Sequence, residues 1–425
     1  DGGSGGQCAP TPNDNVYFTS NSFSNANQVI TLDIDNNGIV NLDWTGVTNS
    51  PQFNMTSKSL EISGSVTYTA DMSISSPGTL KFITNSNSFF TSAGHNTGNL
   101  DIDKSGGVFS QLDNFNSSNR SLYVRSGSTY NSNDYDLSFH QVIFHGSPSG
   151  SVTTTINTGV SKITIDGYRL EIAADSNNRN MITDFSSSTI HLKTAALSGS
   201  YYRKDNFGHI ISEDAPSWRS VGYHVDRIRK FEIIQNSTNY QNDPQVISTE
   251  FGSYHDNNNR GGIIDTLIIN KYTRFNTNYN PVVGDIQFKG NALTVEFGTS
   301  GTLTVSNSMS FDGGGCSVTT FKSTSGGNQA TLNLLSTDTV TATNLSLRDM
   351  AFTGSGTLVA QASVDQGNNS GVAITQLDSR NLYWVGGSGN WSDSNHWSLS
   401  DGGSGGQCAP TPNDNVYFTS NSFSN

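Results

Sequence analysis

The stretch that decides the fold is LEISGSVTYTADMSISSPGTLKF, residues 60–82. It begins and ends with an apolar, charged, apolar triplet, Leu60-Glu61-Ile62 and Leu80-Lys81-Phe82, separated by mostly small and polar residues. Alternate residues of a strand face opposite sides of a sheet. Each triplet therefore predicts a short strand that buries two apolar side chains and exposes the residue between them.

The same apolar doublet recurs along the first half of the chain, at steps of 20, 20, 22, 20 and 21 residues. Such steps are too long for uniform hairpins and too short for a strand plus a crossover helix, but they suit one coil of a parallel β-solenoid. The doublets are Leu60/Ile62, Leu80/Phe82, Leu100/Ile102, Leu122/Val124, Val142/Phe144 and Ile163/Ile165, then Ile190/Leu192, Leu267/Ile269, Ile286/Phe288 and Leu303/Val305, with further candidates at Leu332/Leu334 and Leu345/Leu347.

We therefore expect an all-β chain folded as a parallel β-helix, or β-solenoid, with rungs of 20–22 residues. The alternative is a string of antiparallel sandwiches, which requires hairpin turns such as Asn-Gly between paired strands. Only Asn37-Gly38 fits that requirement well.

The composition limits the partners of the chain. Charged residues make up 13% of it, the net charge is −13 and the pI is near 4.9, so the protein repels phosphate backbones and anionic membranes. No stretch approaches the ~20 apolar residues that a membrane span needs. We expect no nucleic-acid partner and no membrane span, and we expect any export signal to lie outside this sequence.

A second feature is an exact duplication. DGGSGGQCAPTPNDNVYFTSNSFSN occupies residues 1–25 and again residues 401–425. A repeat of that length predicts a tandem array with a period of 400 residues, in which residue 401 starts the next copy. If most of one period were coiled, about 19 rungs spaced ~4.8 Å apart would give at most roughly 90 Å of solenoid per repeat.

The segment YWVGGSGNWSDSNHWS, residues 383–398, precedes the second copy and has a composition unlike that of a rung. It holds Trp384, Trp391 and Trp397 among glycines and small polar residues. A solenoid ends in an open strand edge, and bulky aromatic side chains can cover such an edge. We interpret the segment as an inter-repeat joint; the alternative is a platform on which sugars stack.

The chain has three cysteines, and Cys408 is the copy of Cys8. None forms a CxxC pair or a zinc-like cluster. Cys316 can bridge to Cys8 or to Cys408, within or between chains, in an oxidising compartment, or the thiols can stay free and buried.

We divide the chain into five parts: 1–50, the downstream half of a joint with the first strands; 51–198, the first half of the solenoid; 199–274, an irregular insertion rich in Tyr and Arg; 275–380, the second half of the solenoid; and 381–425, the joint. Aromatic residues and arginine are typical of contact surfaces. The insertion is therefore the candidate contact surface, which would cover the solenoid, contact a neighbouring chain or bind a glycan, through Tyr201, Tyr202, Trp218, Tyr223, Arg227 and Arg229.

Two short motifs are candidates for calcium. Asp33, Asp35 and Asn37, and likewise Asp101, Asp103 and Ser105, match the first half of a calcium loop. Both motifs lack the bidentate glutamate at position 12 of such a loop, and acids that point outward from a strand also explain them. Calcium is the one cofactor that the sequence suggests.

Parallel β-helices include polysaccharide-cleaving enzymes, in which paired carboxyl groups act on the glycosidic bond. This chain has no Asp-Asp pair and no Gly-His-Gly string. We expect no catalysis. The alternative that stays open is a tandem carbohydrate-binding or polysaccharide-degrading β-helix enzyme.

The joint has a recognisable sequence. WVGGSGNWSDSNHWS, followed by a Gly-rich turn, PTPNDNVYF and SFS, and then by LDWTGV at residues 42–47, resembles the repeat opening of giant cell-surface proteins of Bacteroidota. Those proteins are gliding-adhesin-like filaments exported by the type IX secretion system.

This resemblance implies an extracellular structural protein at the cell surface that serves in cell adhesion. The duplication predicts further identical repeats in the same chain as partners, and the Tyr- and Arg-rich insertion predicts contacts with parallel chains in a homo-oligomeric bundle or with cell-surface glycans. The resemblance also places the natural repeat boundary near Asn381.

Overall fold

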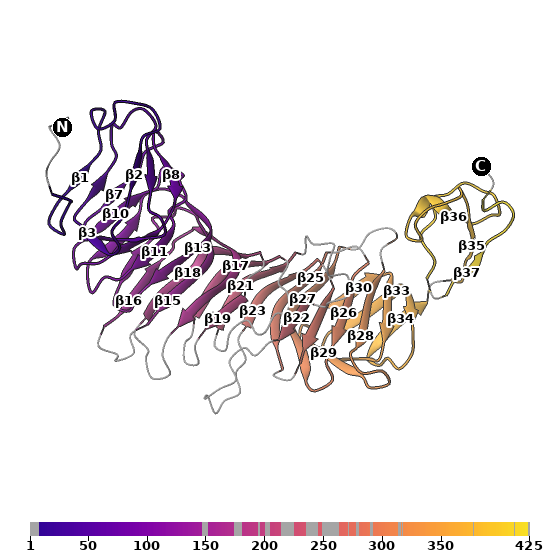
Figure 1. Cartoon of the computed structure of the whole chain (residues 1–425). Helices are drawn as coiled ribbons and strands as arrows, with labels where there is room; N and C mark the ends of the chain where they lie inside the picture. The colour runs from indigo at the N-terminus through magenta and orange to yellow at the C-terminus, as the bar shows by residue number, and fades with distance from the viewer. Residues whose placement is uncertain are drawn as a thin grey trace. The chain divides into compact units, whose positions relative to one another are not determined.

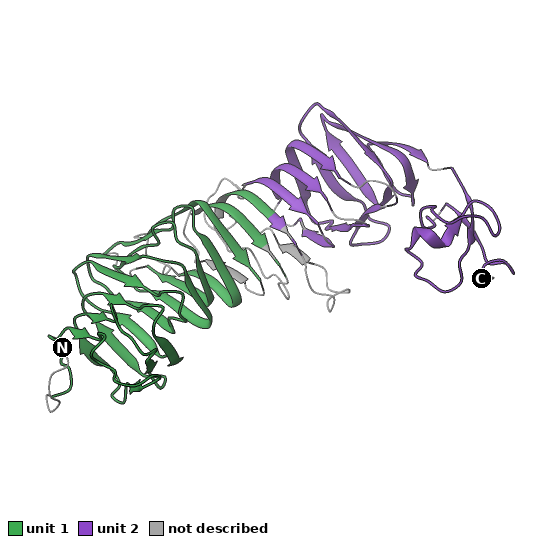
Figure 2. Ribbon diagram, turned by 90° about the horizontal axis from the view of Figure 1, so that it is seen from above, with its two compact units in different colours: residues 1–231, 236–238, 250–262 green, residues 232–235, 239–249, 263–425 purple. Residues whose placement is uncertain are grey.

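In the computed structural model, the described residues are 8–146, 152–173, 181–193, 196–199, 205–213, 225–234, 245–248, 263–270, 272–277, 280–289, 292–312, 316, 318–376, 378–411 and 413–423. Apart from one 3₁₀ turn, their regular structure is all β-strand (Figure 1). The chain forms two compact units, residues 1–231, 236–238 and 250–262, and residues 232–235, 239–249 and 263–425 (Figure 2). In the described part of the chain, no helix is long and apolar enough to cross a membrane.

Unit 1 is a parallel β-solenoid whose strands stack into three ladders. The first ladder holds β1 (Val16–Tyr17), β4 (Leu42–Asp43), β7 (Val66–Thr67), β10 (Ser88–Thr91), β12 (Val108–Gln111), β14 (Thr129–Asn131), β16 (Thr154–Asn157) and β18 (Met181–Leu192). The second holds β3 (Asn37–Ile39), β6 (Ser59–Ile62), β9 (Thr79–Phe82), β11 (Asn99–Ile102), β13 (Phe115–Val124), β15 (Leu137–His145), β17 (Lys162–Ala173), β19 (Ala196–Gly199) and β20 (Asp205–Ser212), together with the C-terminal part of β18, which pairs with β17 and β20. The third holds β2 (Val29–Thr31), β5 (Gln52–Asn54) and β8 (Ser73–Ser76).

The predicted doublets form the core of unit 1. Leu80 pairs in register with Leu60 on one side and Leu100 on the other, and Leu100 pairs with Leu122. These leucines are at most 3% exposed. Every coil thus buries its apolar pair against the pairs above and below, which confirms the predicted parallel β-solenoid.

The ladder departs from the prediction after Val142. Val142 pairs with Leu170, whereas Ile163, which we expected as the next rung, pairs with Leu137. Strands β15 and β17 each carry two inward-facing apolar pairs separated by an irregularity in register. The coil is longer here, so it contains two apolar doublets of the same pattern, Ile163/Ile165 and Leu170/Ile172. The second of them, and not the first, continues the ladder from Val142/Phe144.

The corners between strands use residues that tolerate a left-handed backbone. Half of the non-glycine residues with positive φ in the described part of the chain are asparagines. Gly98, with φ of 73°, lies so close to the carbonyl of Gly78 in the previous coil that a Cβ would overlap it. The Asn- and Gly-rich composition therefore serves the turns of the coil.

Unit 2 is also built of parallel strands that stack into ladders. One ladder holds β23 (Ile263–Ile269), β25 (Val282–Phe288), β27 (Thr302–Phe311), β29 (Ala330–Leu334) and β32 (Met350–Gly354). A second holds β22 (Gln245–Ser248), β24 (Thr273–Asn276), β26 (Thr294–Phe297), β28 (Thr319–Ser323), β31 (Leu345–Arg348) and β33 (Thr357–Asp365), and β33 also pairs with β30 (Thr339–Thr343) and β34 (Val372–Gln376).

The predicted doublets of unit 2 are buried as well. Leu267 pairs with Ile286, but Ile286 pairs with Met309 rather than with Leu303. Leu303 lies earlier in the same long strand, β27, and pairs with Leu332. The physical reason is the same as in unit 1: one long strand supplies two inward pairs.

Solenoid strands continue into residues 199–274, where we expected the insertion. Ile210 of β20 pairs with Ile190, and Ile228 and Phe231 of β21 (Val225–Ile233) are buried. The ladder therefore has a shorter gap than the sequence predicted.

The stacked core predicts a clear mutational contrast. Leu122→Ala should lower the free energy of unfolding by about 3 kcal/mol, because it opens a cavity in a core that the neighbouring coils hold in place. Leu112→Ala, at a side chain that is 40% exposed, should cost less than about 1 kcal/mol. Urea unfolding of both variants measures the difference, and equal losses would contradict the stacked core.

Candidate functional site: the inter-repeat joint

The joint is a small sheet built around β35 (Asn381–Trp384). β35 pairs antiparallel with β36 (Trp397–Ser398) and parallel with β37 (Asn415–Tyr417), and the 3₁₀ turn η1 (Ser394–His396) leads into β36. β37 lies inside the duplicated 25 residues. The joint therefore brings together the last strand of one copy and the first strand of the next.

Two of the three predicted tryptophans form the core of the joint. Trp384 and Trp397 are 5% and 0% exposed and meet edge to face, with ring centroids 5.0 Å apart, beside Leu382. Their indole N–H groups donate to the carbonyls of Gly387 and Trp391, at 2.6 and 2.8 Å. Buried indoles usually find such an acceptor, so the loops that carry these two carbonyls help to hold the indoles in place.

The glycines of the segment make room for a histidine. The ring of His396 stacks on Trp384 with centroids 4.7 Å apart, and its Nδ1 lies 2.7 Å from the carbonyl oxygen of Val385. A Cβ on Gly389 would overlap this ring. The Gly-rich loop therefore wraps closely around the side chain that covers Trp384.

Trp391 has a different environment. It packs edge to face on Trp397, with centroids 4.8 Å apart, but it is 52% exposed. Its free face is the one tryptophan surface of the joint on which a sugar ring could stack, so that alternative stays a prediction for Trp391.

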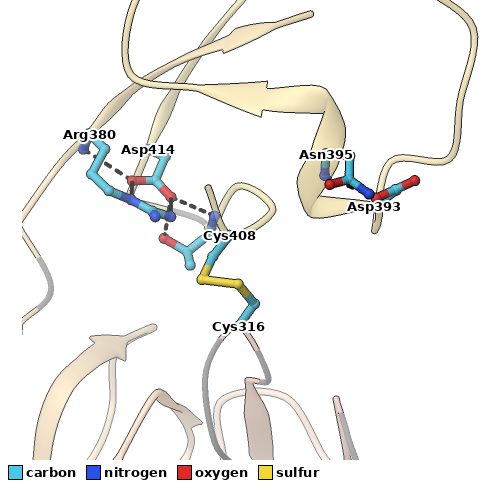
Figure 3. The surroundings of a disulfide bond; sticks show 7 residues. Cys316, Arg380, Asp393, Asn395, Cys408 and Asp414 are labelled. Atoms are coloured by element: carbon cyan, nitrogen blue, oxygen red, sulfur yellow. Dashed lines mark hydrogen bonds and ion pairs between the residues drawn. A yellow bond between two sulfur atoms is a disulfide. The ribbon is translucent and has the colours of Figure 1, made fainter. Parts of the chain in front are cut away.

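A partly buried ion pair also stabilises the joint. Arg380 donates from Nε to Oδ1 of Asp414 at 3.0 Å and from Nη2 to Oδ2 at 2.7 Å, and the Asp414 side chain is fully covered (Figure 3). Thr411 also donates to this carboxylate through its N–H and its hydroxyl. Burial raises the pKa of Asp414, but the hydrogen bonds from Arg380 and Thr411 outweigh it and lower the pKa to about 2.

A disulfide ties the joint to the solenoid of unit 2. It joins Cys316 to Cys408, 92 residues apart in sequence, with Cα atoms 4.8 Å apart (Figure 3). The structure thus selects one of the two bridges that the sequence left open. Cys8, the copy of Cys408, is an exposed free thiol.

Most of the candidate calcium residues have protein partners. Asp101 accepts two hydrogen bonds from Arg125, at 2.8 and 2.9 Å. Oδ2 of Asp103 lies 3.4 Å from Nζ of Lys81, as an ion pair. Ser105 donates to Asn85 in the coil below.

In the other motif, Asp33 is exposed, Asp35 accepts from the N–H of Ser59 at 2.8 Å, and Asn37 donates to the carbonyl of Pro10 at 3.4 Å. Among the described residues, no three acidic, histidine or cysteine side chains gather as a metal cluster. Calcium binding stays a prediction.

Most residues of the candidate contact surface lie outside the described part of the chain. Tyr201, Tyr202, Trp218 and Tyr223 lie outside the described residues. Arg227 and Arg229 lie in β21, and Arg229 is exposed.

The sequence did not predict the contacts that the duplicated segment makes. Arg380 and Asp414, Asn381 and Asn415, and Tyr383 and Tyr417 are each 34 residues apart, and nothing local links them. The available signal was Thr411 three residues before Asp414, a spacing typical of a turn closed by a carboxylate. No protein-family model, curated protein or solved structure matches the chain.

The ion pair predicts an acid-sensitive joint. Because the pKa of Asp414 is lower in the folded state, its stabilising contribution is present above pH 4 and is lost as the pH falls toward 2. Arg380→Gln should weaken the joint by about 2 kcal/mol at pH 7 and flatten this pH dependence. Hydrogen exchange of residues 378–423 measures both effects. Arg229→Gln is the control, and an unchanged acid response in Arg380→Gln would contradict the assignment.

The disulfide predicts a labelling pattern. A maleimide applied to the native, unreduced protein should modify only Cys8, and after reduction and unfolding it should modify all three cysteines, as mass spectrometry can count. Reduction should also speed hydrogen exchange in the joint, whereas Cys8→Ser should not. Labelling of Cys316 or Cys408 before reduction would contradict the bridge.

Proposed function

We propose that this chain is a structural and adhesive repeat unit of a long extracellular surface filament, with no catalytic role. Stacked solenoids give the filament its reach, and repetition gives it avidity, because many weak contacts on one chain act together.

The observation that carries this proposal is the double use of the duplicated segment. Its first copy supplies β1, which pairs with β4 at the start of the unit 1 solenoid. Its second copy supplies β37, which pairs with β35 after the unit 2 solenoid. A segment that fits both the start and the end of the folded period is what a tandem array requires.

The proposed location is the cell surface. Two observations support it: the disulfide Cys316–Cys408, because such bonds persist in oxidising compartments, and the resemblance of the joint sequence to repeats of Bacteroidota filaments exported by type IX secretion. We further propose that parallel chains bundle and that cell-surface glycans are the adhesion partners.

Electron microscopy tests the proposal. A chain of several repeats should form filaments with a regular axial repeat of about 90 Å or less per copy, from ~4.8 Å per rung. Isolated globules would contradict it. Release of reducing sugar from polysaccharides by the same material would instead support the alternative, a tandem polysaccharide-degrading β-helix.

A further inference from the structure

The duplicated segment has the same local conformation in its two environments. The turns on either side of the strand repeat hydrogen bond for hydrogen bond. They are Thr11 N–H to Asp14 at 2.7 Å and Thr411 N–H to Asp414 at 2.7 Å, and Thr19 N–H to Ser22 at 2.9 Å and Thr419 N–H to Ser422 at 2.9 Å. One strand in one conformation thus accepts β4 as a partner in one copy and β35 in the other.

The two partners use opposite edges of that strand. In the second copy, the N–H of Asn415 donates to the carbonyl of Arg380, next to β35. In the first copy, the N–H groups of Val16 and Phe18 donate to the carbonyls of Asn41 and Asp43, on β4, both at 2.8 Å. Successive N–H groups of a strand point to opposite sides, so the two sets of bonds do not compete.

The asparagine side chains repeat this arrangement. Asn415 donates from its Nδ2 to Asn381 at 3.1 Å. Its copy, Asn15, accepts at its Oδ1 from Asn41 at 2.6 Å. A single amide has both a donor and an acceptor, so one asparagine can make both bonds at once and extend a side-chain ladder over three strands.

Two phenylalanines of the duplicated segment are more covered in the first copy than in the second. Phe23 is 6% exposed in the first copy, where it stacks on Trp44, and Phe423 is 64% exposed in the second. Phe18 also contacts Trp44, at 4.1 Å between centroids. Its copy Phe418 lies beside the tryptophans of the joint, 6.0 Å from Trp384 between centroids, and is still 55% exposed. The residues that cover the first copy, 26–50, are those that the repeat would supply next.

We infer that the exposed edge of β37, with Phe418 and Phe423, is the docking surface for the following copy of residues 26–70, so that one strand is shared by two consecutive repeats. β35 then extends the first ladder of the next repeat, and the antiparallel β36 ends it. The joint is the N-terminal cap of the next solenoid rather than a linker after the previous one.

The disulfide gains a role from this arrangement. Cys408 is the first cysteine of the next copy, so the bond from Cys316 fastens that cap to the preceding solenoid. Every junction of an array would carry one such bond. By the same rule, Cys8 would pair with the cysteine equivalent to Cys316 in a preceding copy of the repeat, so it is a free thiol in this chain. This inference needs only a second copy of the repeat and is independent of what the filament adheres to.

Extension of the chain tests the inference. We would add the sequence of residues 26–70 after residue 425 and compare this protein with the 425-residue chain by hydrogen-exchange mass spectrometry of residues 413–423. The amides of Val416 and Phe418 should exchange about 100-fold more slowly or better in the extended chain. Chymotrypsin cleavage after Phe418 and Phe423 should slow in parallel.

Matched controls separate docking from added length. An extension of scrambled sequence should give no protection. Trp44→Ala in the added copy should remove the protection of residues 413–423, and Trp44→Ala in the first copy should leave it intact. The inference is overturned if residues 413–423 exchange equally fast with and without the native extension while residues 26–70 of the first copy are protected in the same sample. Absence of filaments by microscopy would leave this result unaffected.

Discussion

The structure depends on one constraint: every strand of a parallel stack has two hydrogen-bonding edges, and each edge needs a neighbour. Within a unit the next coil provides it, as Leu80 between Leu60 and Leu100 illustrates. Each coil buries its apolar pair only when the coils above and below are in place, so stability is a sum of neighbour contacts. Free edges remain only at the ends of the stack, where they attract other chains. The joint is best understood from this requirement.

The sequence predicted the interior of the fold well and its irregularities poorly. An apolar doublet such as Leu100/Ile102 can be recognised from the sequence alone. The alternation of apolar and polar residues and the recurrence of the doublet at a fixed step are both visible in a short stretch of chain. Between Val142 and Leu170 the step lengthens, and Ile163/Ile165 has the same pattern as the doublet that continues the rung. A pattern of residue types states that a pair faces inward. It does not state which part of a longer coil that pair occupies.

The joint shows the same limit more strongly. Three tryptophans among glycines marked the segment as a candidate core, but nothing in the pattern separated the buried Trp384 and Trp397 from the exposed Trp391. No comparable sequence pattern indicated the contacts that position the next copy. Arg380 binds Asp414 and Cys316 binds Cys408 across 34 and 92 residues, and either pairing is one of several that the composition allows. Only the fold, which brings β37 beside β35, selects these partners.

The period of the sequence and the unit of folding therefore differ in phase. If β37 serves two repeats, a cut anywhere in the duplicated segment divides a sheet, and the apparent start of a repeat lies inside the structure that begins with Arg380. Such an arrangement replaces two open ladder ends at each junction by one continuous sheet, closed by the antiparallel strand β36. It also gives the buried indoles of Trp384 and Trp397 and the ion pair of Arg380 with Asp414 one common role, because together they hold the strand on which the next repeat would pair.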